Sequence, residues 1–124
     1  MRYRPVVRRA APALALSTDS SLLTAAGNDL GFDAIFARQV EAHGRPGDLL
    51  VLVSTSGNSP NLLRAAEAAQ ARGVRTVGLL AKGGGALAPL VDHAVIVPVD
   101  DPALAQEIQL AIDHFVCATV EPTL

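Results

Sequence analysis

Cysteine, aromatic residues and long apolar runs are scarce in this sequence, and each scarcity excludes a class of structure. The single cysteine, Cys117, excludes an internal disulfide and fits a reducing compartment. No apolar run approaches the roughly 18 residues that a membrane span requires, so we expect no membrane association. The formal net charge of −2 gives no general electrostatic reason to bind nucleic acid. A cytoplasmic location is the simplest interpretation.

The composition predicts a core of small side chains. Half of the residues are hydrophobic (50%) but only 3% are aromatic, so Ala, Leu and Val must fill the interior. Such side chains let helices approach a sheet closely, yet each buries little area. The length of 124 residues is that of one domain. We therefore expect a single domain that gains stability by associating into a homo-oligomer.

The chain is organised around residues 48–71, which join an apolar run to a helix. Residues 49–53 are all Leu or Val, which is typical of a parallel strand covered on both faces. Helix-period apolar positions resume at Leu62. Between them, Ser59 is suited to cap the helix and Pro60 occupies the favoured first helical position. A strand is thus predicted to enter a helix through a loop of hydroxyl groups.

This loop has the residue types of an anion site. The first N–H groups of a helix lack partners and carry the positive end of its dipole, and serine hydroxyls add donors. A phosphate group is the expected ligand. Alternatively, Ser, Thr, Gly and Asn at these positions simply form a turn and a cap. Neither a Walker loop nor a dinucleotide fingerprint is present, so nucleotide binding is not indicated.

The remaining pattern alternates strands with helices. Strands are predicted at residues 13–17, 49–53, 74–80 and 94–97, and helices at 21–26, 32–42, 60–71, 86–91 and 102–120. This order favours right-handed crossovers and a parallel sheet between helical layers. In such sheets, ligands bind outside the carboxyl ends of the strands. Three loops, residues 17–21, 54–59 and 82–85, are therefore expected to converge on one pocket.

The final helix carries two kinds of pattern. Its predicted core-facing stripe consists of Leu104, Ile108, Ile112, Phe115 and Thr119. Glu107 and His114 share another face, and Gln106 lies nearby. From the residues alone, His114 is interpreted as an ordinary surface or interface histidine.

Four ordered motifs together resemble the phosphoheptose isomerases, which are sugar isomerase (SIS) domain proteins. They are STSGNS at 54–59, GNDLGF at 27–32, RQVEAHGRPGD at 38–48, and Gln106-Glu107 with His114. The resemblance extends from Arg2 to Glu121. It implies a Rossmann-like three-layer α/β/α sandwich with a parallel sheet. It also implies assembly as a homotetramer with active sites at subunit contacts.

The resemblance further implies an activity and the roles of individual residues. Phosphoheptose isomerases convert sedoheptulose 7-phosphate into D-glycero-D-manno-heptose 7-phosphate through an enediol. His114 resembles the catalytic histidine, and no cofactor is required, although relatives that bind zinc use the positions of Gln106 and His114. The residues that resemble substrate contacts are Ser54, Thr55, Ser56 and Ser59 at the phosphate, with Asp29, Gln106 and Arg2 elsewhere on the substrate.

The sequence also departs from the family. Phosphoheptose isomerases begin earlier, with a helical pair, a first strand ending in a Gly-Asn-Gly-Gly-Ser loop, and a helix bearing the catalytic glutamate. Residues 1–124 are therefore expected to be one SIS domain without these parts, and slow or inactive alone, because a positioned base typically supplies about 10²–10⁴-fold of rate. Either the natural protein is longer, or the chain pairs with another subunit. Alternative functions are a non-catalytic phosphosugar-binding module, an adaptor for the replication initiator, or a phosphosugar-sensing regulatory domain.

Overall fold

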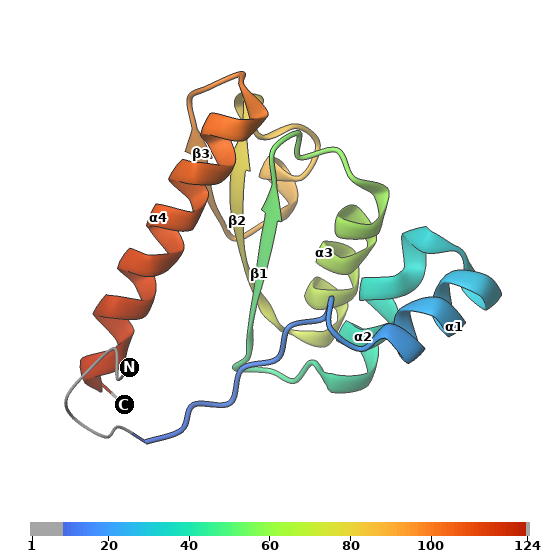
Figure 1. The fold of residues 1–124 in the computed structure, drawn as a ribbon. Coiled ribbons are helices and arrows are strands. Elements are labelled where there is room, and N and C mark those ends of the chain that lie inside the picture. The colour runs from blue at the N-terminus through green and yellow to red at the C-terminus, as the bar shows by residue number, and fades with distance from the viewer. Residues whose placement is uncertain (1–8, 124) are drawn as a thin grey trace.

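The computed structural model describes residues 9–123 and is built on a parallel sheet of three strands (Figure 1). The strands are β1 (Leu49–Ser54), β2 (Arg75–Ala81) and β3 (His93–Val97), in the order β1-β2-β3. Both pairings are parallel. Parallel pairing brings the carboxyl ends of all three strands to one edge of the sheet, at the top of Figure 1.

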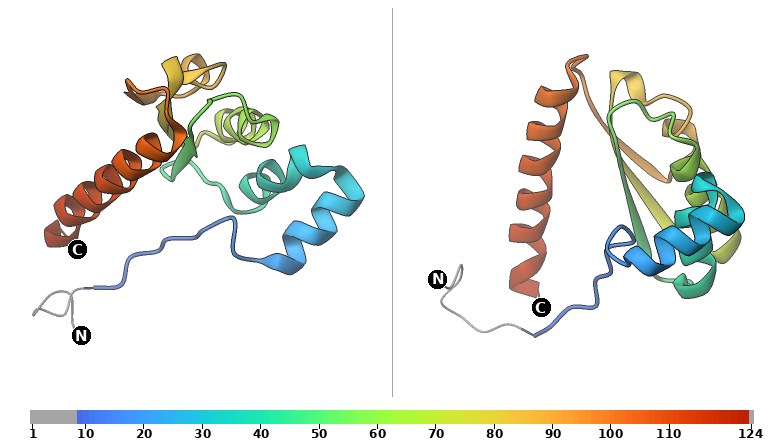
Figure 2. Two further views of the ribbon diagram at one scale, coloured as in Figure 1. Left: turned by 45° about the horizontal axis from the view of Figure 1, so that its top comes forward. Right: turned by 45° about the vertical axis from the view of Figure 1, so that its right-hand side comes forward.

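Helices cover both faces of this sheet, which confirms the predicted α/β fold. One layer contains α1 (Ser20–Leu30), α2 (Ile35–His43) and α3 (Pro60–Arg72), and α4 (Pro102–Val120) lies on the opposite face (Figure 2). Short 3-10 turns join these elements at Phe32–Ala34, Lys82–Gly84, Ala88–Leu90 and Glu121–Thr123. The arrangement in space is the three-layer sandwich expected from the alternation of elements.

Small side chains bring α3 against the sheet, as the composition predicts. Ala65, Ala66 and Ala69 are completely buried, and they share one core with Leu52 of β1 and Leu80 of β2. Alanine leaves no long side chain between helix and strand, so the two backbones approach closely. The carboxyl end of β1 and the amino end of α3 are held in a fixed relation by this contact.

A reciprocal hydrogen-bonded pair fixes the start of β3 beside β2. The Asp92 carboxylate accepts hydrogen bonds from the Thr76 backbone N–H at 2.7 Å and from its hydroxyl at 3.0 Å. The Asp92 N–H donates to the same hydroxyl at 2.9 Å. The backbone hydrogen bond first, and then the hydroxyl, lower the pKa of Asp92 by stabilising its charged form.

The predicted strand at residues 13–17 is wrong. This segment is irregular, and Leu16 is held by its carbonyl, which accepts a hydrogen bond from the Gln39 side chain at 2.9 Å. A strand needs a neighbouring strand to pair its backbone groups, and no described strand lies beside this one. Its apolar side chains alone therefore do not make it a strand.

Three helix boundaries also differ from the prediction. The first helix does not end at Gly27 but continues as Ser20–Leu30, and Gly31 ends it with a φ of 87°. The helix predicted at 32–42 begins as the 3-10 turn Phe32–Ala34. The helical piece predicted at 86–91 is reduced to the 3-10 turn Ala88–Leu90.

The predicted core stripe of the last helix is confirmed in part: Ile108 and Ile112 pack against the core, but the other positions of the stripe do not. Phe115 is 71% exposed and Leu104 is 45% exposed, whereas the fully buried positions of α4 are Ala105 and Gln109. Ala105 packs against Ala81 and Val97, so α4 contacts the sheet through its first three turns. The carboxyl-terminal half projects beyond the sheet and leaves its apolar side chains exposed.

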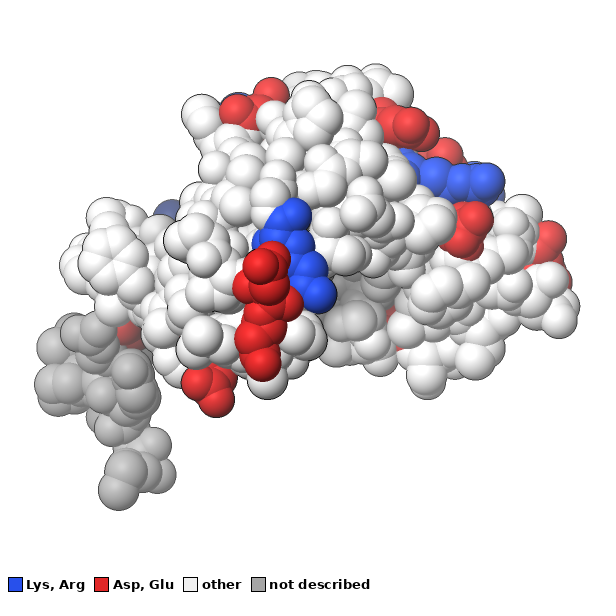
Figure 3. Space-filling model, turned by 90° about the horizontal axis from the view of Figure 1, so that it is seen from above, with Lys and Arg blue, Asp and Glu red and all other residues white. Residues whose placement is uncertain are grey.

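The surface at the carboxyl ends of the strands carries little charge. Figure 3 shows this face with its acidic and basic side chains in small separate groups rather than in a broad basic patch.

In the part of the chain from residue 9 to 123, no helix is long and apolar enough to cross a membrane.

Candidate functional site

A recess of about 270 Å³ lies at the carboxyl end of β1. It brings together the loop between β1 and α3 with the amino-terminal half of α4, which are about fifty residues apart in sequence. Its lining residues are Val53, Ser54, Thr55, Ser56, Ser59, Gln106 and Gln109. Four of these seven residues carry hydroxyl groups, so the recess is a concentrated set of neutral hydrogen-bond donors.

The loop backbone fixes two of these hydroxyl groups in place. The Ser54 hydroxyl accepts a hydrogen bond from the Gly57 N–H at 3.0 Å, and the Ser56 hydroxyl accepts one from the Asn58 N–H at 3.2 Å. In both cases the oxygen acts as an acceptor toward the protein. Each hydroxyl therefore keeps its own proton for donation to a ligand.

The amino end of α3 contributes Ser59 and a helix dipole. Ser59 stands at the N-cap, as predicted, but its side chain makes no capping hydrogen bond. The Leu62 and Leu63 N–H groups donate to the Ser59 carbonyl at 3.0 and 3.1 Å, and Pro60 has no N–H. These three positions of α3 therefore offer no free backbone donor, and the hydroxyl groups and the helix dipole remain to attract an anion.

The loop that follows β2 stabilises the conformation of the loop between β1 and α3. Asn58 accepts a hydrogen bond from the Ala86 N–H at 2.9 Å and donates to the Ser56 carbonyl at 3.1 Å. Gly57 has a φ of 65°, and a Cβ there would overlap the Gly84 carbonyl. The corner after β2 therefore supports the hydroxyl loop from behind, although it does not line the recess itself.

Two glutamines of α4 close the recess. Gln109 is 3% exposed, and its side-chain amide donates to the Leu79 carbonyl at 2.9 Å and to the Ser54 carbonyl at 3.4 Å. Gln106 lies one turn earlier on the same side and is exposed. Gln109 was not predicted: its place three positions after Gln106 in an apolar helix marks it as unusual but does not show which backbone groups it contacts.

The electrostatics of the recess are those of a neutral cradle. None of its lining residues is Lys or Arg, and none is Asp or Glu. A bound anion would be held by hydroxyl and amide donors near the positive end of α3, without an ion pair. This donor set suits a phosphate group attached to a small molecule.

A family model described as SIS domain matches residues 3–81. The chain belongs to the SIS-domain family. The hydroxyl loop and the strand β1 that leads into it lie inside this matched region. Five of the seven residues that line the recess are therefore in the matched region, and the other two, Gln106 and Gln109, come from α4, which follows it.

Relatives of this SIS domain include phosphoheptose isomerases. The one from Pelobacter propionicus is 54% identical over 117 residues, which is 94% of this chain and 62% of the relative. The one from Rhodospirillum rubrum is 51% identical over 113 residues, 91% of this chain and 60% of the relative. The chain thus spans about three fifths of the length of these relatives, and the predicted resemblance is confirmed.

Solved structures of phosphoheptose isomerases also match this chain. The phosphoheptose isomerase from Neisseria gonorrhoeae has a TM-score of 0.86 and 42% identity, covering 88% of this chain and 61% of the other. The one from Francisella tularensis has a TM-score of 0.88 and 38% identity, covering 90% of this chain and 60% of the other. The fold of this SIS domain is therefore that of phosphoheptose isomerases over nearly all of its length.

The structure unites most of the predicted site residues. Ser54, Thr55, Ser56, Ser59 and Gln106 all line the recess. Their individual roles stay predictions, because a shared recess does not identify the ligand. Of the three loops expected to converge on one pocket, only residues 54–59 line the recess, and neither residues 17–21 nor residues 82–85 reach it.

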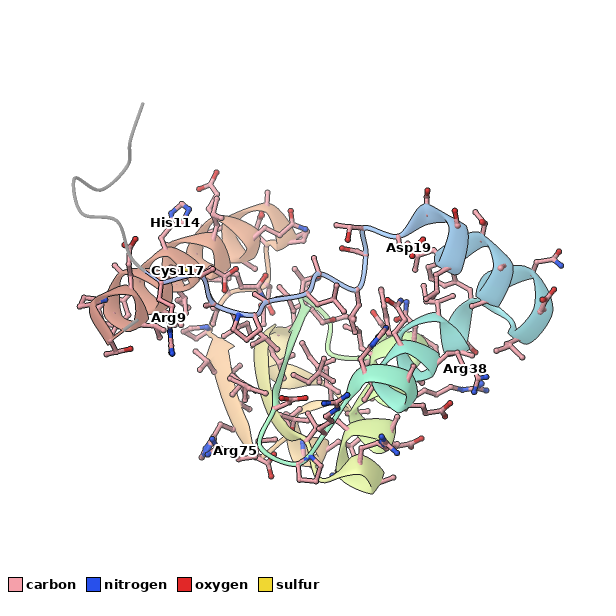
Figure 4. The ribbon with its side chains drawn as sticks, turned by 90° about the horizontal axis from the view of Figure 1, so that it is seen from below. Arg9, Asp19, Arg38, Arg75, His114 and Cys117 are labelled. Atoms are coloured by element: carbon pink, nitrogen blue, oxygen red, sulfur yellow. The ribbon has the colours of Figure 1, made fainter. Side chains whose placement is uncertain are left out.

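Three other predicted residues lie elsewhere. Asp29 is exposed on α1, where its carboxylate accepts a hydrogen bond from the Asn28 side chain at 2.8 Å. His114 is exposed on α4, in the same stretch of helix as Cys117 (Figure 4). Arg2 lies outside the described residues. Within one chain, neither Asp29 nor His114 belongs to the recess.

Gln106 and His114 of one chain do not fit a zinc centre by themselves. They are eight positions apart on α4, which separates them by about 12 Å along the helix axis, whereas zinc is bound at about 2.0–2.1 Å from nitrogen. Residues 9–123 contain no group of three His, Cys, Asp or Glu side chains that could hold a metal ion.

Proposed function

We propose that this chain is the phosphate-binding part of a phosphoheptose isomerase. The observation that carries the proposal is the recess at the amino end of α3, where Ser54, Thr55, Ser56 and Ser59 gather around a neutral cavity. Its volume of about 270 Å³ suits a phosphate with the adjoining carbons of a sugar. The similarity to phosphoheptose isomerases selects sedoheptulose 7-phosphate as the substrate.

The recess would act by positioning rather than by chemistry. Isomerisation between a ketose and an aldose through an enediol requires a base to move a proton between neighbouring carbons. Holding the phosphate end fixes the distance of those carbons from that base, which lowers the entropic part of the barrier. In this proposal the base belongs to a part of the enzyme that this chain does not span. Gln106 contacts the sugar from the opposite wall.

We also place the protein in the cytoplasm as a homotetramer. Exposed apolar side chains on β1 and on the carboxyl-terminal half of α4 support association, because isolated monomers rarely leave such surfaces open. Asp29 and His114, which lie away from the recess of their own chain, would then serve sites at subunit contacts.

Thr55→Val tests the phosphate site with little change of shape. The substitution removes one hydroxyl that lines the recess and for which no hydrogen bond within the described protein is seen. A hydrogen bond to a charged group is worth about 1.5–3 kcal/mol, so the Kd for sedoheptulose 7-phosphate should rise at least about tenfold in calorimetric titration. Thr24→Val makes the same chemical change on the exposed side of α1 and should leave the Kd unchanged. Equal affinities of the two variants would reject the site.

His114→Ala tests the proposed catalytic role separately. Because His114 does not line the recess, phosphate binding should be retained. Turnover should fall by about 10²–10⁴-fold, the usual contribution of a general acid or base. The measurement needs a form of the protein that carries the additional segments of its relatives. Undiminished turnover would remove His114 from the mechanism, and binding without any turnover in the unsubstituted form would favour the non-catalytic module.

A further inference from the structure

The buried amide of Gln109 is fixed in one orientation at the wall of the recess. Its nitrogen donates to the Leu79 carbonyl at 2.9 Å and to the Ser54 carbonyl at 3.4 Å. A carbonyl oxygen only accepts hydrogen bonds, so the nitrogen of the amide, and not its oxygen, must face these two groups. Both N–H bonds are used in this way, and the amide therefore cannot turn over without losing both partners.

The Oε1 oxygen of the same amide is unpaired and open to the recess. It accepts no hydrogen bond from any residue between 9 and 123. No buried side-chain nitrogen or oxygen in that range lacks a partner, so Oε1 must lie where solvent reaches it. Gln109 is only 3% exposed and lines the recess, and its small accessible area therefore lies on the recess side.

This oxygen differs from the other polar side-chain groups that line the recess. The four hydroxyl groups of the loop between β1 and α3 both donate and accept hydrogen bonds. Gln106 is exposed, its side chain makes no hydrogen bond within residues 9–123, and either end of its amide is free to face a ligand. Oε1 of Gln109 is a fixed acceptor, so a ligand group binds it favourably only by bringing a proton.

A phosphate oxygen is a poor partner for this acceptor. The second pKa of a phosphate monoester is about 6, so nearly all of it is a dianion without a proton at about pH 8. A phosphate oxygen and Oε1 would then repel each other. The phosphate is better placed toward Ser56 and Ser59, at the positive end of the α3 dipole. The carbons attached to it would extend across the recess toward α4.

We propose that Oε1 of Gln109 accepts a hydrogen bond from the hydroxyl group on the carbon next to the phosphorylated carbon of the substrate. The proposal rests on the proposed function and adds a specificity-determining residue to it. In a sugar phosphate this hydroxyl is the one nearest to the phosphate. The recess of about 270 Å³ has room for its carbon as well as for the phosphate. A phosphate ester without this hydroxyl would leave Oε1 to water and would bind more weakly.

A second buried glutamine, away from the recess, provides a matched control. Gln39 of α2 is also 3% exposed, and its amide nitrogen donates to the Leu16 and Ile35 carbonyls, both at 2.9 Å. It does not line the recess. Removing the Gln39 amide should therefore cost stability in the same way as removing the Gln109 amide, without changing how a ligand is recognised.

The test compares two ligands of equal charge that differ by one hydroxyl group. Racemic glycerol 1-phosphate has a hydroxyl on the carbon next to the phosphorylated one, and 3-hydroxypropyl phosphate lacks it. Their Kd values are measured by NMR titration of the full chain at about pH 8, where both phosphates are dianions. One hydrogen bond between neutral groups corresponds to about three- to tenfold in Kd, so glycerol 1-phosphate should bind more tightly by this factor.

Substitutions assign this preference to Gln109. Gln109→Met keeps an unbranched side chain of similar length without the oxygen, and the two ligands should then bind equally. Gln39→Met should lower the free energy of unfolding to a similar extent and keep the preference. Gln109→Lys retains donors for the two carbonyls and lacks an acceptor, so it is the second variant should Gln109→Met fail to fold. Its charge should tighten the binding of both ligands, and the preference should again be lost.

Three results would overturn the inference. Equal Kd values in the unsubstituted chain would mean that Oε1 binds only water. A preference that survives in both Gln109 variants would assign the hydroxyl to another group. Tighter binding of both ligands as the pH is lowered to about 5, lost in Gln109→Met, would assign Oε1 to a proton on the phosphate. No lining residue of the recess titrates in this range, so such a pH effect would come from the ligand.

Inorganic phosphate separates this inference from the proposed function. It tests the phosphate site without any hydroxyl-bearing carbon. Binding of inorganic phosphate and of both esters without a preference would leave the phosphate site intact and reject only the role of Gln109. Absence of binding by all three would reject the phosphate site itself, and the inference with it.

Discussion

Gly57→Ala is expected to abolish sugar-phosphate binding and to destabilise the domain. Gly57 has a φ of 65°, where a residue with a Cβ costs roughly 1–2 kcal/mol. Its new Cβ would also overlap the Gly84 carbonyl, and a backbone neighbour cannot rotate away as a side chain does. Adding a typical overpacking cost, we expect a loss of at least about 2 kcal/mol in the free energy of unfolding. Denaturant unfolding and calorimetric titration measure the two effects.

Gly83→Ala separates the steric effect from the backbone effect. Gly83 has a φ of 76°, similar to that of Gly57, but a Cβ there would meet nothing within 4 Å. This variant should lose only the roughly 1–2 kcal/mol of backbone strain and should still bind the sugar phosphate. If Gly57→Ala behaves in the same way as Gly83→Ala, the interlock between the two loops does not shape the recess.

Ser59→Asp is expected to abolish phosphate binding while leaving the domain folded. Aspartate is as good an N-cap as serine and interacts favourably with the helix dipole, so stability should be equal or slightly greater. A carboxylate about 4 Å from a bound phosphate costs about 4 kcal/mol at an effective dielectric constant of 20. We therefore expect the Kd for sedoheptulose 7-phosphate to rise at least a hundredfold, with thermal unfolding as the measure of folding.

Ser59→Asn is the matched control because asparagine has nearly the same shape and capping ability without the charge. Its loss of affinity should be limited to that of one hydroxyl, and it should not depend on ionic strength. The larger loss in Ser59→Asp should shrink as salt is added, since ions screen the repulsion. Equal affinities of the two variants would mean that no phosphate lies near Ser59.

Much of the fold was predictable because the decisive signals are local. The Leu and Val run of β1, the Ser59-Pro60 start of α3 and the Gly73 stop each specify a boundary within a few residues. The segment at residues 13–17 was not predictable in this way, since a strand exists only where another strand pairs with it. The exposure of Phe115 on α4 was missed for a similar reason: periodicity identifies an apolar face but not how far the sheet extends beneath it.

The recess, too, was predictable from the sequence only in part. Its hydroxyl loop follows from the sequence, because one βα junction contains Ser54, Thr55, Ser56 and Ser59 together. Gln109 could not be assigned, since its role depends on the approach of α4 to the end of β1, about fifty residues away. The support of that loop by Gly84 and Ala86 likewise required the tertiary structure.

The attachment of α4 has a mechanical consequence. The helix is held at one end, through Ala105 and the hydrogen bonds of Gln109, and its remaining turns extend freely as a rigid rod. A small tilt of α4 at its held end therefore moves its carboxyl-terminal end by a larger distance. Gln106 lies near the held end of α4 and lines the recess. A ligand that displaces Gln106 would therefore tilt the helix, and the resulting movement would be largest near Val120.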